Sequence, residues 1–68
     1  MKTKIYIQKG VFAGQTFSGH NSESIARRIY GRKAVIRWDN DPNSPSDGTI
    51  GIPTPYGLKV RAVFRFDN

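Results

Sequence analysis

Cationic side chains near the end of the chain alternate with apolar ones, a spacing that could bind phosphate groups. Lys59, Arg61 and Arg65 hold three of the four odd positions of residues 58–66, while every even position is apolar. Neighbouring side chains of a strand point to opposite faces, so the pattern predicts a strand with one core face and one cationic face. Clustered lysines and arginines attract phosphate oxygens, which makes this face a candidate site for a polyanion.

The same division recurs in residues 4–8 and 33–38, where apolar positions alternate with polar ones. If these strands pair with residues 58–66, one sheet face carries a tyrosine and two valines among six cations: Lys4, Tyr6, Lys33, Val35, Arg37, Lys59, Arg61, Val63 and Arg65. An exposed Tyr6 could then stack on an unpaired base. The surface is contiguous only if residues 33–38 lie beside residues 58–66, and the strand order is not determined by the sequence.

A second cationic cluster follows the predicted helix and comprises Arg27, Arg28, Arg32 and Lys33. A phosphate group or an acidic helix could dock there. Both clusters also have simpler explanations. Cations near a helix C-terminus interact favourably with the helix dipole, and antiparallel sheets of small domains commonly have a polar outer face. The absence of an acid alternating with the sheet cations favours a binding role for that face.

Other residues whose side chains could bind a metal ion or take part in catalysis do not form a recognisable site. Asp39, Asp41 and Asn43 alternate as in a calcium loop, but Ser44 stands where that loop needs glycine and Ile50 where it needs a bidentate acid. His20 with Ser18 and Ser22 has no partnered acid near it in sequence, and the chain contains no cysteine. We therefore expect no metal site, no cofactor and no enzymatic activity.

A short helix is predicted from residue 21, because Ile25 and Ile29 are four residues apart. Asn21 or Ser22 can cap its first turn, and Gly31 can end it. The chain before it predicts a strand at residues 4–8. Residues 11–18 form either a second strand with a bulge at a glycine or a hairpin arm paired with the first strand.

The chain after the helix predicts a strand at residues 33–38, an exposed loop at 39–48 and the final strand at 58–66. Residues 49–52 are expected to add a short edge strand, because Pro53 and Pro55 lack the amide donors that a central strand needs. The expected fold is α+β, a small antiparallel sheet of three to four strands with one short helix on one face. The predicted core is Ile5, Ile7, Phe17, Ile25, Ile29, Ala34, Ile36, Trp38, Leu58, Val60, Ala62, Phe64 and Phe66.

Size and charge limit the classes of protein. With 68 residues the chain holds one domain, residues 1–68, and its 11 Lys and Arg against 5 Asp and Glu give a net charge of +6. Such a charge attracts nucleic acid or an acidic protein surface, although it also keeps a small domain soluble. No apolar run is long enough to cross a bilayer. We expect a cytoplasmic protein without a membrane partner.

Residues 5–9 and 14–17, followed by the run Ser-Ile-Ala-Arg-Arg-Ile at 24–29, form a strand-to-helix unit. This unit resembles small phage-encoded proteins, among them anti-CRISPR inhibitors of type I systems. The proline-containing residues 42–55 depart from the resemblance, and no residue role is carried over. The resemblance implies an inhibitor that docks on a Cas surveillance complex in the cytoplasm of the host cell.

Two functional hypotheses remain at this point. The first is a basic binding module that engages nucleic acid or a nucleoprotein complex through the cationic sheet face. The second is a phage-type inhibitor or adaptor that binds a host protein directly, with Tyr30, Tyr56 and residues 42–55 as its candidate contacts. The protein could be a monomer, or a dimer formed by the pairing of exposed edge strands.

Overall fold

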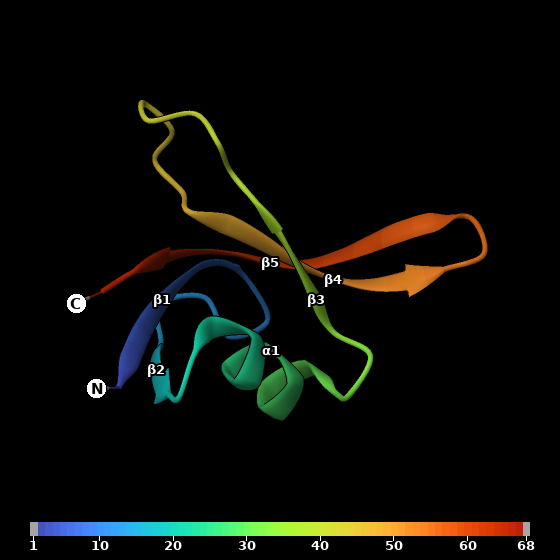
Figure 1. Cartoon of the computed structure of the whole chain (residues 1–68), viewed down its shortest axis with the longest axis horizontal. Helices are drawn as coiled ribbons and strands as arrows, with labels where there is room; N and C mark the ends of the chain where they lie inside the picture. The colour runs from blue at the N-terminus through green and yellow to red at the C-terminus, as the bar shows by residue number, and fades with distance from the viewer. Residues whose placement is uncertain (1, 68) are drawn as a thin grey trace.

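The structure is a computed structural model that describes residues 2–67, and it shows a small α+β fold with one helix on one face of an antiparallel sheet (Figure 1). The sheet has five strands in the order β2-β1-β5-β4-β3. The elements are β1 (Thr3–Gly10), β2 (Thr16–Gly19), α1 (Ser22–Tyr30), β3 (Val35–Trp38), β4 (Gly48–Thr54) and β5 (Gly57–Phe66). The predicted α+β class is confirmed, but the expected number of strands, three to four, is wrong. No helix in the described part of the chain is long and apolar enough to span a membrane.

The helix forms where the sequence predicts it. The side chain of Asn21 accepts a hydrogen bond from the Ser24 amide at 2.8 Å, and the Gly31 amide donates to the carbonyl of Arg27 at 3.0 Å. Gly31 has a positive φ of 106°, a conformation that a side chain would strain. Both ends of this nine-residue helix are therefore capped, and Ile25 and Ala26 are buried against the sheet.

The core lies between α1 and the sheet. It consists of Ile5, Ile7, Ile25, Ala26, Ala34, Ile50, Ala62 and Phe64, with Phe12, Phe17, Ile29, Tyr30, Ile36 and Ile52 packed around them. Trp38 and Phe66 were expected inside but are exposed at the margin of the core. They stack on each other with centroids 5.9 Å apart, and both rings also contact the buried ring of Phe64 edge-on.

A bulge in β5 corrects the prediction for Leu58 and Val60. Ala62 pairs with Ile50 while Val60 pairs with Gly51, so Arg61 is an extra residue without a partner on β4. Residues that face each other across a strand pair share one sheet face, so the bulge turns Leu58 and Val60 to the face opposite Ile50. Val60 is accordingly 52% exposed instead of buried.

The strand order overturns two further expectations. β4 is a central strand that pairs with both β3 and β5, so residues 33–38 and 58–66 are not neighbours. The prolines do not prevent this arrangement, because β3 pairs with β4 only as far as Gly51. Pro53 lies beyond that point, where β4 needs a partner on one side alone.

The far half of β4 and β5 extends beyond the rest of the sheet. Residues 52–59 pair only with each other, since β1 contacts β5 at residues 62–66 and β3 contacts β4 at residues 48–51. We call residues 52–59 the ribbon. Figure 1 shows the ribbon projecting from the sheet, while residues 39–47 rise from the opposite end on the side away from α1.

Candidate nucleic-acid interface

The predicted site residues on β1 and at the end of β5 lie together on the sheet face opposite α1, which we call the outer face. Lys4 lies opposite Ser18, and Tyr6 lies opposite Arg65. The guanidinium carbon of Arg65 is 4.9 Å from the ring centroid of Tyr6, a cation–π contact. Tyr6 is half-buried, so the expectation of a free ring for base stacking is not supported.

A second bulge brings one unpredicted cation to the outer face. Ile7 pairs with Phe64 but Lys9 pairs with Val63, which leaves Gln8 as the extra residue. Successive cross-strand pairs on the outer face therefore form one row of four residues: Lys9, Val63, Thr49 and Arg37. Strict alternation would place Lys9 beside Ile5 and Ile7 in the core, so only its exposure as a charged side chain signals the bulge.

Lys59 and Arg61 are not part of the outer face. Lys59 pairs with Ile52, which packs against the core on the helix side. The charge of Arg61 lowers the pKa of Tyr30, a residue of α1, although burial has the larger effect and raises this pKa. Arg61 therefore acts on the helix side of β5. The predicted face carrying Arg61 and Arg65 together does not form.

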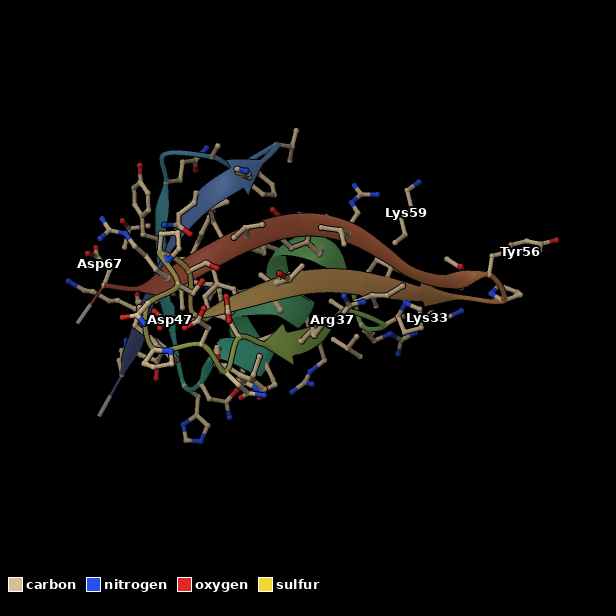
Figure 2. The ribbon with its side chains drawn as sticks, turned by 90° about the horizontal axis from the view of Figure 1, so that it is seen from above. Lys33, Arg37, Asp47, Tyr56, Lys59 and Asp67 are labelled. Carbon is tan, nitrogen blue, oxygen red and sulfur yellow. The ribbon has the colours of Figure 1, made fainter. Side chains whose placement is uncertain are left out.

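The predicted cluster at the helix end is dispersed. Arg27 is exposed on α1, and Arg28 instead points to β2, where it donates a 2.7 Å hydrogen bond to the carbonyl of Ser18. Arg32 and Lys33 are exposed in the turn before β3. Figure 2 shows Lys33 and Arg37 on the same side of the β4–β5 hairpin.

Aspartates organise the loop at residues 39–47. Asp39 accepts hydrogen bonds from the Ser44 and Ser46 hydroxyls and the Asp41 amide, and these bonds lower its pKa. The loop is anchored to the sheet by two hydrogen bonds. Gln8 Nε2 donates to the Pro45 carbonyl at 2.9 Å, and the Phe66 amide donates to Asp47 Oδ2 at 2.7 Å. Negative charge is thus held close to the end of β5 that carries Arg65.

The aspartates and the cations Lys33, Arg37 and Lys59 occupy different parts of the molecule. Figure 2, seen from the outer face, shows Asp47 and Asp67 at the end remote from the ribbon. Lys59 lies on one side of the β4–β5 hairpin, and Lys33 and Arg37 lie on the other side. No acid occurs in residues 24–38 or 48–66, which include these three cations. We call Lys33, Arg37 and Lys59 the flanking cations.

Comparisons with known proteins found no match to a protein family, to a curated protein or to a solved structure. The geometry of the described residues is therefore the basis for a functional assignment. Within residues 2–67, no three His, Cys, Asp or Glu side chains gather as a metal site would require.

Proposed function

We propose that the protein is a non-enzymatic module that binds nucleic acid, or a nucleoprotein complex, through the flanking cations. The observation that carries this proposal is their arrangement on both sides of the β4–β5 hairpin, in segments of the chain without acids. Lysine and arginine bind phosphates by releasing condensed counterions, and this term dominates non-specific affinity for nucleic acid. In this proposal the cations bind the phosphates, and the hairpin between them projects toward the nucleic acid.

The flanking cations are better placed for this role than the outer-face cations of β1 and of the end of β5, Lys9 and Arg65. Arg65 contacts Tyr6, and the neighbouring strand end is joined to an acidic loop through the Asp47 carboxylate. A phosphate approaching Arg65 would also approach this carboxylate. Arg37 and Lys59 are exposed, and in Figure 2 both lie on the ribbon side of Asp47 and Asp67. Binding should therefore depend more on Arg37 and Lys59 than on Arg65.

Fluorescence anisotropy with a labelled 20-mer, measured from low to physiological salt, tests the proposal. If the three flanking cations each contact one phosphate, the logarithm of the association constant should fall with the logarithm of salt with a slope of about −2 to −3. The double variant R37Q/K59Q should reduce that slope by about 1.5 to 2. Absence of binding to DNA and RNA at low salt would overturn the proposed function.

A matched variant controls for the loss of net charge. K9Q/R65Q also removes two positive charges, but from the outer face at β1 and β5. It should weaken binding less than R37Q/K59Q and leave most of the salt slope intact. A larger loss in K9Q/R65Q would instead assign the contact to the outer face. Circular dichroism of both variants would establish that they are folded.

A second candidate, an inhibitor or adaptor that binds a host protein directly, has its own structural support. Val35, Gly51 and Val60 form a cross-strand row on the outer face, and the two valines are 41% and 52% exposed. Leu58 lies over Gly51 in the same patch. Exposed aliphatic rows of this kind occur at protein interfaces. An anti-CRISPR-like inhibitor of a Cas surveillance complex is one form of this alternative.

The two candidates differ in what must be substituted to abolish binding. Val60→Ser should disrupt a protein interface at the aliphatic row and leave nucleic-acid binding close to that of the unmodified chain. R37Q/K59Q should have the opposite pattern. Purification of partners from a host lysate after nuclease treatment distinguishes the two: a stoichiometric protein that is retained by the unmodified chain and lost with Val60→Ser favours the inhibitor.

A further inference from the structure

Tyr56 stands at the tip of the ribbon with its side chain 99% exposed (Figure 2). It is part of the two-residue turn between Thr54 and Gly57, which pair with each other. In this position the ring is not buried, so it adds no hydrophobic stabilisation to the fold. Its place at the most distant point of a projecting element therefore suggests a role in contact with a partner rather than in the fold.

The turn holds Tyr56 in a fixed place. Thr54 Oγ1 donates to the Gly57 carbonyl at 2.7 Å and accepts from the Tyr56 amide at 3.2 Å. Pro55 restricts the backbone before the tyrosine, and Gly57 takes a φ of 120° that favours glycine. The exposed ring is thus presented by an ordered turn, which lowers the entropy lost when it binds.

The ribbon lacks the groups that read paired bases. Its side chains other than Lys59 and Tyr56 are Ile52, Pro53, Thr54, Pro55 and Leu58. The one hydroxyl among them is already used within the turn. Discrimination in the major groove depends on hydrogen bonds to base edges, so these residues are unsuited to it. Apolar and aromatic side chains instead suit the flat faces of bases, which are accessible where bases are unpaired.

We propose that Tyr56 stacks on an unpaired base while the flanking cations hold phosphates farther along the same strand, so that the preferred ligand is single-stranded nucleic acid. This inference rests on the proposed function, because it adds a base contact to the same phosphate-binding half of the molecule. Stacking of one base on an aromatic side chain contributes to affinity without sequence preference. The protein should therefore bind single strands of different sequence with similar affinity.

The experiment compares one labelled 20-mer, free and annealed to its complement as a blunt duplex, with 2-aminopurine replacing a central base. Tyr56→Ala should weaken binding to the single strand by about 5- to 150-fold and abolish most of the fluorescence quenching that stacking causes. Its salt slope should not change, because no phosphate contact is lost. Tyr56→Phe keeps the ring and should behave like the unmodified chain. Val11→Ala, which truncates another exposed apolar side chain outside the ribbon, is the matched control.

The outcomes separate this inference from the proposed function. If the unmodified chain binds neither form at low salt, both are overturned. If it binds but Tyr56→Ala has unchanged affinity and quenching on the single strand, the stacking role alone is overturned. An equal loss on the blunt duplex would also overturn it, because the ring would then act as a wedge between paired bases rather than on an unpaired one.

Discussion

Arg61 and Arg65 act on different tyrosines, although they are only four positions apart in β5. Arg65 contacts Tyr6 on the outer face, whereas the charge of Arg61 acts on Tyr30 on the helix side. In a regular strand, positions four apart share a face. The bulge that leaves Arg61 without a partner on β4 accounts for the difference. The two arginines therefore have separable effects.

The separation predicts that Arg61→Gln raises the pKa of Tyr30 while Arg65→Gln leaves it unchanged. Burial raises the pKa of Tyr30 by disfavouring the phenolate, and the positive charge of Arg61 partly opposes this by favouring it. Removal of that charge leaves the effect of burial alone. Titration of the Tyr30 ring signals by NMR in the three proteins measures both shifts. An equal response to both substitutions would mean that the two arginines share a face.

The helix and the inner positions of the first strand could be predicted because they depend on local signals. Asn21 caps the helix and Gly31 ends it, as the sequence indicates. Ile5 and Ile7 are fully buried as the alternation of β1 predicts. Each of these features needs only neighbouring residues, so a single sequence contains the information.

The outer face could be predicted only in part, because the rest of it depends on features that alternation does not encode. Gln8 and Arg61 each shift the register of their strand by one residue, and each shift reverses the face of everything beyond it. Lys9 was missed and Lys59 was misplaced for this reason. The position of β4 between β3 and β5 follows from long-range pairing, which strand patterns alone do not specify.

Two glycines of β4 should differ in their tolerance of alanine. A Cβ on Gly48 would lie 2.8 Å from the ring of Phe64, which is fully buried and cannot move away. A Cβ on Gly51 would lie 2.6 Å from Leu58, a flexible side chain at the surface. Gly48→Ala should lower the free energy of unfolding by about 1 to 3 kcal/mol, and Gly51→Ala by less. Urea denaturation of both variants checks the order, and a reversed order would contradict the packing described here.

The N-terminal cap of α1 should contribute measurably to stability. Asn21→Ala removes the hydrogen bond from the Ser24 amide, and such substitutions cost about 0.5 to 2 kcal/mol. A helix of nine residues has no stability of its own to compensate. Asn21→Ser retains a capping oxygen and should stay close to the unmodified chain in thermal denaturation. Equal losses of stability in the two variants would contradict this prediction, because a variant that keeps a capping oxygen would then be no better than one without it.

Tyr30→Phe should stabilise the protein and change its response to alkaline pH. The Tyr30 hydroxyl is buried without a hydrogen-bond partner, and an unsatisfied buried polar group costs about 1 to 3 kcal/mol.

The raised pKa of Tyr30 adds a dependence on pH. Because the pKa of Tyr30 is raised in the folded state, the fold favours the neutral phenol. The unfolded chain therefore releases this proton first, and stability that is complete below about pH 10 declines as the pH rises through the folded-state pKa. Tyr30→Phe removes this contribution. Urea denaturation at pH 7 and above pH 10 should show the variant to be more stable at both values, with the larger advantage at the higher pH. A constant advantage at both values would mean that Tyr30 ionises equally readily in the folded and unfolded states.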